Sequence, residues 1–455
     1  MSQQIALFAG SFNPPGAHHR RIAARLAETF DEVVVIPSGP RAGEPVANDV
    51  LPIYLAAMAD VNFRHLDRVR VELSDLEAGQ FTPLYRLAEQ FAPAAEAWIV
   101  VGANLIAGGA AGQSVIQNSW EHGDQLWRDG RFVVVAGGEQ PLSPADLPPH
   151  HRVINAEEIR SSTAVRSHLF NSRPVADLLL PEVADYIARH GLYRGVPPTR
   201  RSRLHVQGTR LKVVSDPRNE EAQRIAQSFP DSHDDPELIV VIGGDGTMLR
   251  AIREHWRLRV PFYGINAGHL GFLLNDVPAA SLADEEFLLE HVPLLRVEME
   301  MKDGTRESAL AFNDVWVERA TGQTAWIEVR VNGEQRLARL VADGALVATA
   351  AGSTSYARAM GATPLPLGTS ALLLVGSNVL SPDGWRPVVL PLESVIELRS
   401  VDPEKRPLHG FVDGYAHGLV RWMSARMSNI AAAELAFSPG HDPVAKLSKI
   451  QFPAR

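Results

Sequence analysis

The sequence contains no cysteine among its 455 residues. Disulfide bonds, thiolate metal sites and a cysteine nucleophile are therefore excluded. It also lacks any apolar run near the ~18 residues of a membrane-spanning helix. Its start, MSQQIALFAG, has no basic region followed by a long apolar stretch, so it does not read as a secretory signal. We expect a cytoplasmic protein with no membrane partner.

An excess of positive charge is lacking as well, because the formal net charge is −9. No overall field attracts nucleic acid, so we expect no nucleic-acid partner, and local groups must hold any anionic substrate. Apolar residues make up 45% and charged residues 21% of the chain, which is typical of a soluble globular protein. The length predicts two or three domains.

Residues 1–194 alternate short apolar segments with helix-like ones, in the order IALFAG, RRIAARLAETF, EVVVIP, EAWIVVG and RFVVVAGG. This alternation predicts an α/β domain with a doubly wound parallel sheet. An amphipathic helix, VADYIARHGLY, closes it at Gly191. The paired prolines and the arginines of RGVPPTRRSR then predict a linker over residues 195–203.

The remainder of the chain predicts an α/β domain over residues 204–294 and a mostly β domain over residues 295–455. RLKVVS and ELIVVIGG are strand-like and flank the helical pattern NEEAQRIAQSF. Further on, Asn332-Gly333 separates two alternating segments, which is a strong hairpin signal. ALLLVG, RPVVLP and SVIELRSV are further short strands.

The segment VVIGGDGTMLR, residues 240–250, places one carboxylate among three glycines where an apolar strand gives way to a helix. A helix N-terminus after such a turn suits phosphate oxygens, and glycines let a diphosphate approach the backbone. We therefore expect phosphate contacts from Gly243, Gly244 and Thr247. Asp245 would accept a proton from a substrate hydroxyl or orient a Mg²⁺ ion. Neither G-x-x-x-x-G-K-[ST] nor G-x-G-x-x-G is present here.

Three more segments follow in order: GINAGHLGFL, FNDVWVER and DGALVATAAGSTSYARAMG. Together with GGDGT they resemble the NAD kinases over roughly residues 205–440. Those enzymes transfer the γ-phosphoryl group of ATP to the 2'-hydroxyl of the adenosine ribose of NAD. The resemblance implies an NAD-kinase-type α/β domain followed by a β-rich domain. It also implies ATP and NAD as substrates, with Mg²⁺ carried by ATP rather than by fixed protein ligands.

The resemblance makes Asp245 the general base. The residues that it implies for NAD binding are Gly246, Asn313, Asp314, Asp343, Thr354, Tyr356 and Asp413. Asp413 either lines the site or caps a turn, and His269 is interpreted as a structural histidine. The chain departs from the family at several positions: Asp314 replaces a glutamate, Ala350 and Ala351 replace a proline and a hydroxyl residue, and Ala359 replaces a serine.

Two helix starts in the first third of the chain carry hydroxyl, imidazole and guanidinium groups, in LFAGSFNPPGAHHRRIAARL and IRSSTAVRSHL. Such groups at helix N-termini predict a triphosphate site. With LLLPEVADYIARHGLY, these segments resemble the nicotinate or nicotinamide mononucleotide adenylyltransferases over residues 4–193. Those enzymes join the mononucleotide phosphate to the α-phosphorus of ATP on a doubly wound nucleotidyltransferase fold. The resemblance implies His19 as the catalytic residue and ATP contacts from Gly10, Ser11, Phe12, His18, Ser162, Thr163 and Arg166.

This second resemblance also has departures. The family's [His/Thr]-x-Gly-His is Gly16-Ala17-His18-His19 here, and Asn104 replaces an aspartate. The hypothesis is a fused enzyme, a homo-oligomer, that makes NAD or its deamido form from a mononucleotide and ATP and then phosphorylates NAD. One alternative is a lapsed N-terminal domain that regulates or stabilises the kinase. Another gives GGDGT a lipid hydroxyl as the acceptor.

Overall fold

The computed structural model describes residues 3–40, 50–91, 93, 95–137, 142–156, 159–207, 210–230, 232–268, 271–276, 282–283 and 285–452. The chain forms two compact units, Met1–Thr199 and Arg200–Arg455, which are described separately. The boundary falls inside the segment expected as a linker, because β7 (Arg201–His205) is a strand of the second unit. Arg201 and Arg203 of this strand form ion pairs with Glu290 and Glu286 of the neighbouring strand, which explains why an arginine-rich segment is extended here.

The first unit contains one six-stranded sheet in the order β3-β2-β1-β4-β5-β6, and all of its strand pairs are parallel. This confirms the parallel sheet expected from the alternating pattern. Its strands are β1 (Gln4–Gly10), β2 (Glu32–Pro37), β3 (Val69–Val71), β4 (Glu96–Gly102), β5 (Phe132–Ala136) and β6 (His151–Asn155).

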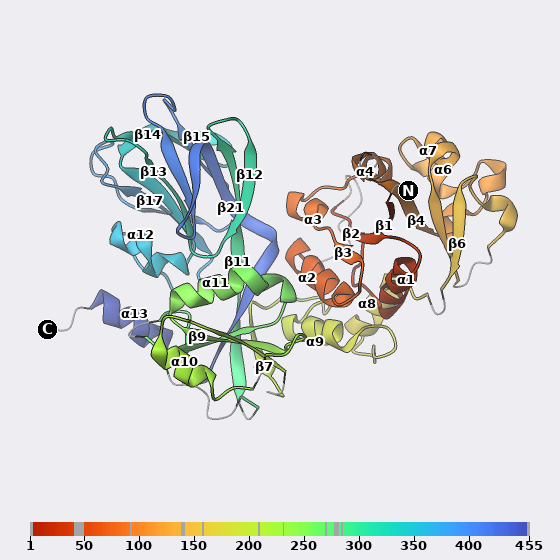
Figure 1. Ribbon diagram of the computed structural model, residues 1–455, viewed down its shortest axis with the longest axis horizontal. Helices are drawn as coiled ribbons and strands as arrows, with labels where there is room; N and C mark the ends of the chain where they lie inside the picture. Colours follow the sequence, from red (N-terminus) through yellow and green to blue (C-terminus); the bar gives the residue numbers. More distant parts are fainter. Residues whose placement is uncertain are drawn as a thin grey trace. The chain divides into compact units, whose positions relative to one another are not determined.

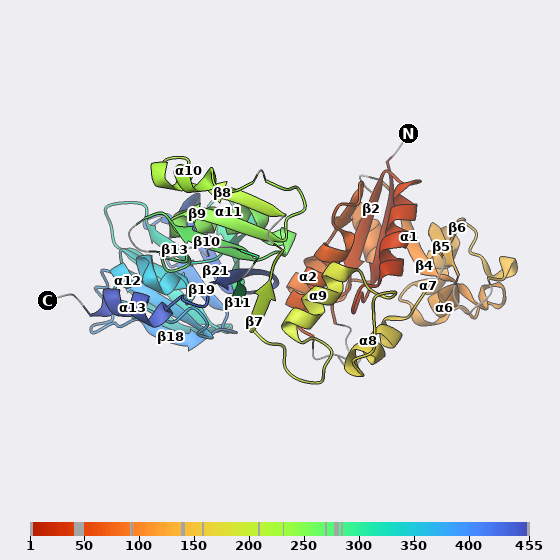
Figure 2. The same cartoon turned by 90° about the horizontal axis from the view of Figure 1, so that it is seen from below.

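Helices cover both faces of this sheet (Figure 2). Ala6 and Phe8 of β1 pack with α1 and α2 on one face, whereas Ile5 and Leu7 pack with α4 on the other. The strands are apolar on both faces, as buried parallel strands require. The helices are α1 (Ala17–Ala27), α2 (Pro52–Phe63), α3 (Ser74–Ala78), α4 (Leu84–Phe91), α5 (Ala103–Ile106), α6 (Val115–Ser119), α7 (Gly123–Asp129), α8 (Ser162–Phe170) and α9 (Pro181–His190). The last of them ends at Gly191, as expected, with φ of 64°.

The second unit begins with a short α/β region, seen in green in Figure 1. Its parallel strands β8, β9 and β10 lie side by side, and helix α11 follows β9 directly. The strands and helices of this region are β8 (Leu211–Ser215), α10 (Glu220–Ala226), β9 (Leu238–Gly243), α11 (Asp245–His255) and β10 (Phe262–Asn266). A strand that ends in the glycines of GGDGT and gives way to a helix was expected, and β9 followed by α11 has this order.

The rest of the second unit is mostly β, as expected. Its strands are β11 (Glu286–Met301), β12 (Arg306–Ala311), β13 (Asp314–Arg319), β14 (Ala325–Val331), β15 (Glu334–Ala342), β16 (Gly344–Ala348), β17 (Ala371–Ser377), β18 (Val388–Pro391), β19 (Ile396–Ser400), β20 (Leu408–Val412) and β21 (Tyr415–Phe437). Two short helices complete it: α12 (Tyr356–Ala359) and α13 (Pro443–Gln451). Asn332 and Gly333 form the two-residue turn between β14 and β15, with φ of 54° and 78°.

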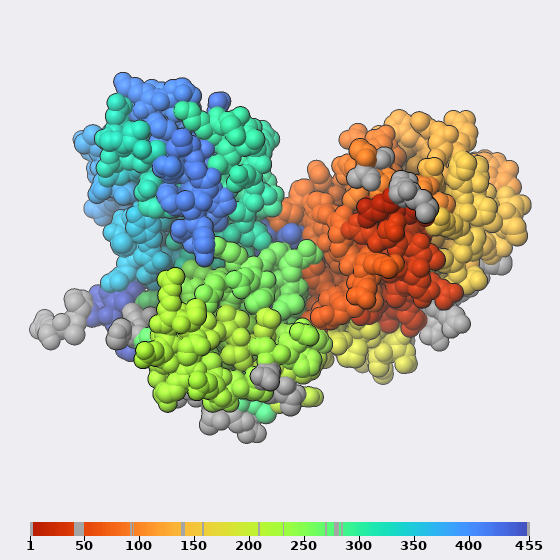
Figure 3. Space-filling model, in the orientation of Figure 1, coloured from red at the N-terminus to blue at the C-terminus, as the bar shows by residue number. Residues whose placement is uncertain are grey.

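The two regions of the second unit share one sheet. Strand β21 pairs with β11 over most of its length and also with β10 of the α/β region. Figure 3 shows residues of β21, in blue, beside the green-blue residues of β11 and β12 on the surface. The boundary expected between residues 294 and 295 lies inside β11. The residue pattern changes at this point, but the strand continues across it.

Candidate active site

The glycines of GGDGT lie where β9 meets α11: Gly243 ends the strand, Gly244 precedes the helix and Gly246 is its second residue. A Cβ atom on Gly243 would stand 2.5 Å from Thr247 Oγ1, so a larger residue would displace that side chain. A Cβ on Gly244 or Gly246, in contrast, would meet no atom of the described residues within 4 Å. The backbone at the N-terminus of α11 is therefore open, which suits a close approach by phosphate.

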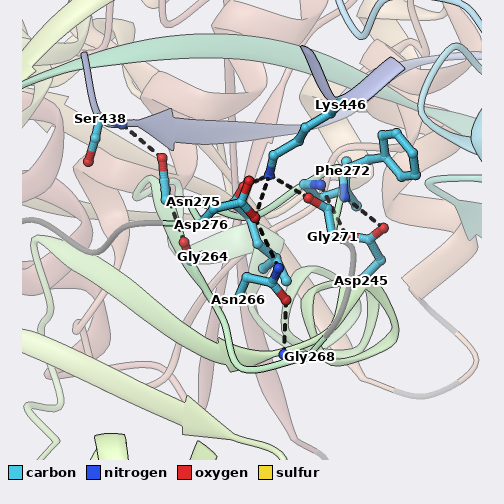
Figure 4. A network of polar contacts seen from close by, with 12 residues as sticks. Asp245, Gly264, Asn266, Gly268, Gly271, Phe272, Asn275, Asp276, Ser438 and Lys446 are labelled. Carbon is cyan, nitrogen blue, oxygen red and sulfur yellow. Dashed lines mark hydrogen bonds and ion pairs between the residues drawn. The ribbon is translucent and has the colours of Figure 1, made fainter. Parts of the chain in front are cut away.

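Asp245 is the first residue of α11, and its side chain points to the segment 271–276 (Figure 4). Its two carboxylate oxygens accept hydrogen bonds from the backbone N–H groups of Phe272 and Leu273, each at 3.0 Å. Burial raises the pKa of Asp245, and these two hydrogen bonds and the charge of Lys446 oppose the increase. Asp245 is thus a fixed, partly desolvated carboxylate.

A cavity of about 230 Å³ is lined by residues of the segment that binds this carboxylate. Phe272 and Leu273 line it together with Thr354 of the STSY segment. Ala350 and Ala351 line it too, so the lost proline and hydroxyl leave methyl groups facing this space. Two motifs far apart in the sequence therefore share one mostly apolar cavity.

Asn313 and Asp314 are held in place by Asp413. The Asp413 carboxylate accepts the backbone N–H groups of Phe312, Asn313 and Asp314 at 2.8, 2.8 and 3.1 Å. Asp413 itself has φ of 46° and forms, with Gly414, the turn between β20 and β21. Asp413 was expected either to line the site or to cap a turn. Its carboxylate caps the backbone of residues 312–314.

The side chains of Asn313 and Asp314, whose backbone Asp413 holds, have unusual surroundings. Asn313 is 7% exposed, and its Oδ1 atom has no hydrogen-bond partner among the described residues. Burial, and secondarily the charge of Asp413, raises the pKa of Asp314 to about 7. A buried carbonyl without a partner and a carboxyl that changes charge near neutral pH are both suited to a polar ligand.

Tyr356 and Asp343 are placed differently by the structure. The Tyr356 ring is 41% exposed and meets Trp316 of β13 edge to face, with centroids 4.5 Å apart. Burial raises the pKa of Tyr356, and the charges of Glu318 and Asp314 add to the increase. Asp343 instead forms an ion pair with Arg319 at 2.6 Å, at the opposite end of β13 from Asp314. Within one chain, Tyr356 belongs to the neighbourhood of Asp314, and Asp343 does not.

The sequence did not reveal Lys446 as a site residue. It lies on α13 with its side chain 4% exposed, and its charge acts on Asp245. Asp442 and Pro443 are typical of a helix start, but the resemblance to the NAD kinases covers only residues 205–440, roughly, and so does not reach this helix. His269, interpreted as structural, lies outside the described residues.

The residues expected to form a site in the first unit lie where β1 meets α1. His19 Nδ1 accepts the backbone N–H of Gly16 at 2.9 Å, so the ring carries its proton on Nε2. Burial, with the neighbouring His18, holds the pKa of His19 well below its usual range. His19 would therefore meet phosphate as a neutral N–H donor. Phe12 is 2% exposed and packs in the core, which leaves its backbone for any ligand contact.

The start of α8 is tied to the same loop. Arg166 donates to the carbonyl of Asn13 at 2.7 Å and to Thr163 Oγ1 at 3.0 Å. Ser162 Oγ donates to the carbonyl of Pro14 at 3.1 Å. The two helix starts identified in the sequence thus lie together, with Gly10 at the end of β1 and the exposed Ser11 following it.

His18 lies in the space that a side chain at position 16 would use. A Cβ atom on Gly16 would stand 2.7 Å from His18 Nδ1 and 3.2 Å from the carbonyl of Leu178. Burial, together with Arg21, lowers the pKa of His18 to about 4. The glycine at 16 and the histidine at 18 are therefore complementary: the small residue makes room for the ring.

This complementarity predicts the effect of Gly16→Ala. The added methyl group would push the His18 ring aside, and we expect the free energy of unfolding to fall by about 1–3 kcal/mol. Thermal denaturation, followed through the unfolding transition of the first unit, would measure this loss of stability. The double variant Gly16→Ala/His18→Ala should recover most of the loss. Equal stability of Gly16→Ala and the natural sequence would contradict the steric coupling.

No helix within the described ranges is long and apolar enough to span a membrane. In the same part of the chain, no group of three or more His, Cys, Asp and Glu side chains is arranged to hold a metal ion.

Comparison with known proteins relates the chain to one family. The family model for the ATP-NAD kinase N-terminal domain matches residues 165–291. The NAD kinase of Rickettsia bellii is 34% identical over 221 residues, which is 48% of this chain and 87% of that protein. The NAD kinase of Hyphomonas neptunium is 31% identical over 239 residues, covering 51% of this chain and 94% of that protein.

Two solved structures are also similar. An NAD kinase from Archaeoglobus fulgidus in complex with ATP has a TM-score of 0.40 and 22% identity, covering 53% of this chain and 95% of that one. A yeast NADH kinase complexed with NADH has a TM-score of 0.41 and 14% identity, covering 100% of this chain and 89% of that one. With its GGDGT turn, the Asn313-Asp314 pair and relatives matched along most of their length, the chain belongs to the NAD kinase family.

Proposed function

We propose that the second unit transfers the γ-phosphoryl group of ATP to the 2'-hydroxyl of the adenosine ribose of NAD. The observation that carries the proposal is the Asp245 carboxylate, fixed by the N–H groups of Phe272 and Leu273 beside the open N-terminus of α11. A general base and a phosphate-binding helix end are the two elements that this reaction needs.

In this mechanism Asp245 accepts the proton of the ribose hydroxyl as the oxygen attacks the γ-phosphorus, and the bond from the γ-phosphorus to the β–γ bridging oxygen breaks to release ADP. Burial raises the pKa of Asp245, which brings the carboxylate toward the range in which a base works best near neutral pH. The backbone at Gly244 and Gly246 receives phosphate oxygens. Asn313 Oδ1, which has no partner among the described residues, accepts a hydrogen bond from NAD.

The donor set agrees with a metal ion that reaches the site bound to ATP. Each oxygen of Asp245 accepts one backbone N–H group and keeps a second lone pair that can accept the proton of a substrate hydroxyl. Mg²⁺ carried by ATP would supply positive charge to the transferred phosphoryl group.

The test is direct. The purified chain is incubated with Mg-ATP and NAD, and the products are identified by mass. NADP is the expected product. No phosphorylated product from NAD, together with phosphorylation of a lipid alcohol in a parallel incubation, would replace this function with the lipid alternative.

For the first unit, we propose adenylyl transfer from ATP to nicotinamide or nicotinate mononucleotide on a nucleotidyltransferase-type fold. The supporting observation is the convergence of His19, Ser162 and Arg166 at two helix starts tied to one loop. The substrate phosphate would attack directly, so the protein's task is to orient and neutralise charge. Incubation with Mg-ATP and each mononucleotide should yield NAD or its deamido form.

A nucleotide-binding regulatory unit is the competing role, favoured by Gly16 in place of the family's histidine or threonine. Calorimetric titration with a non-hydrolysable ATP analogue, followed by the mononucleotide assay, separates the two. Binding without adenylyl transfer would support regulation, and no binding would exclude both roles.

The His19→Ala variant should abolish adenylyl transfer, with a loss of at least about 100-fold, because a phosphate donor at a helix start is removed. Formation of NADP from added NAD should be unchanged, since Asp245 lies in the other unit. His150→Ala, at an exposed position of the first unit, is the matched control. Normal NAD formation by His19→Ala would show that the site lies elsewhere.

A further inference from the structure

The C-terminal helix α13 places a buried ammonium group against the segment that binds Asp245 (Figure 4). Lys446 Nζ donates to the carbonyl oxygens of Gly271 and Leu274, both at 2.6 Å. It also forms an ion pair with Asp276 Oδ1 at 3.3 Å. The side chain of Lys446 is 4% exposed, and its polar contacts within the described residues include two carbonyls and a carboxylate of one short segment. A buried lysine with such partners has a specific task there.

The two carbonyls held by Lys446 flank the two N–H groups that hold Asp245. Gly271 and Leu274 are the outer residues of a four-residue segment whose inner residues, Phe272 and Leu273, donate to the carboxylate. Fixing both outer carbonyls limits rotation of the peptide groups between them, so the N–H pair stays directed at Asp245.

Other contacts hold the same segment from behind. Asn275 donates to the carbonyl of Gly264 at 3.0 Å and accepts the N–H of Ser438 at 2.9 Å. Asn266 donates to Asp276 Oδ1 at 3.0 Å. Lys446 contributes the ammonium group to this network, and it reaches the segment from α13 (Figure 4).

We propose that Lys446 is a positioning residue for Asp245, which aligns the Phe272–Leu273 amide pair and supplies the positive charge that favours the ionised carboxylate. The proposal rests on the proposed kinase function. It assigns to α13 a role in the reaction that neither the motif pattern nor the family comparison contains.

The charges around these groups determine the direction of the effect. Burial raises the pKa of Asp245, and the Lys446 charge opposes that increase. Burial lowers the pKa of Lys446, whereas Asp276 and Asp245 oppose this and Lys449 adds to it. Burial, and secondarily the charge of Lys446, lowers the pKa of His441 to about 4, and Asp276 and Asp442 oppose this. Removing the ammonium group should therefore raise the pKa of Asp245 further, so that the base ionises only at higher pH.

The experiment compares Lys446→Met with Lys449→Met, a matched control at an exposed position of the same helix. For Lys446→Met we expect kcat to fall about 10- to 100-fold, with the KM values for ATP and NAD changed less than about threefold. The acidic limb of its kcat–pH profile should move up by about one pH unit. Lys449→Met should match the natural protein in all three quantities.

A second variant, Lys446→Gln, keeps N–H donors and removes the charge. It should show the same shift of the acidic limb with a smaller fall in kcat. It takes over the test if Lys446→Met does not fold, as judged by circular dichroism. An unmoved acidic limb in the folded variants would overturn the proposal. Loss of folding in both would overturn it too, because Lys446 would then serve the fold rather than the base.

The outcomes separate the two levels of inference. If the natural protein does not phosphorylate NAD, the proposed function fails. If the natural protein is active, Asp245→Asn is inactive and Lys446→Met behaves like Lys449→Met, only the role of Lys446 fails.

Discussion

The Asp245→Asn variant should bind NAD and ATP yet transfer phosphoryl groups about 10²–10⁴ times more slowly than the natural protein. The amide cannot accept the proton of the ribose hydroxyl. It also presents an NH₂ group to one of the two N–H donors of Phe272 and Leu273, so a modest loss of stability of about 1 kcal/mol accompanies the change. Steady-state kinetics and calorimetric titration with NAD measure the two effects separately.

The pH profile gives an independent check on Asp245. Because burial raises the pKa of this carboxyl, the activity of the natural protein should rise with pH along an acidic limb centred above the usual aspartate range. Asp383→Asn, at an exposed position, is the matched control and should keep this profile. Unchanged kcat in Asp245→Asn would refute the general-base role.

The second large effect is expected for Asp413→Ala. Its side chain is 5% exposed and accepts three backbone N–H groups, which the substitution would leave without their acceptor. Alanine also tolerates the φ of 46° poorly. We expect the free energy of unfolding of the second unit to fall by about 3–5 kcal/mol. The KM for NAD should rise as well, because Asn313 and Asp314 lose their support.

Asp413→Asn separates these causes. Asparagine tolerates positive φ and retains one carbonyl acceptor, so it should lose about half as much stability as alanine. Chemical denaturation monitored by tryptophan fluorescence measures both variants. Equal stability of Asp413→Ala and the natural protein would mean that the N–H groups of residues 312–314 find water or other acceptors without cost.

The sequence predicted the parts of the molecule that depend on local patterns. The apolar runs of β1, β2 and β5, the turn at Asn332-Gly333 and the helix stop at Gly191 each follow from neighbouring residues. The strand–glycine–helix order around Asp245 is of the same kind.

What the sequence could not predict depends on contacts between distant segments. Lys446 has no local feature that separates a buried lysine from a solvated one; its role comes from carbonyl groups more than 170 positions away. Likewise, Asp343 and Arg319 form an ion pair because the register between β13 and β16 places the two residues opposite each other. The residue pattern changes between residues 294 and 295, where the β-rich domain was expected to begin, but strand β11 continues through that position.

The shared sheet of the second unit has a mechanical consequence. Strands β11 and β21 extend from the α/β region into the β-rich region and pair with each other in both. The register shifts between Pro293 and Leu295, which pair with Ala432 and Met427, so the ladder of backbone hydrogen bonds is irregular where the two regions join. An irregularity of this kind bends a strand locally. Bending between the regions is therefore expected at this point, while the paired segments on either side of it remain stiff.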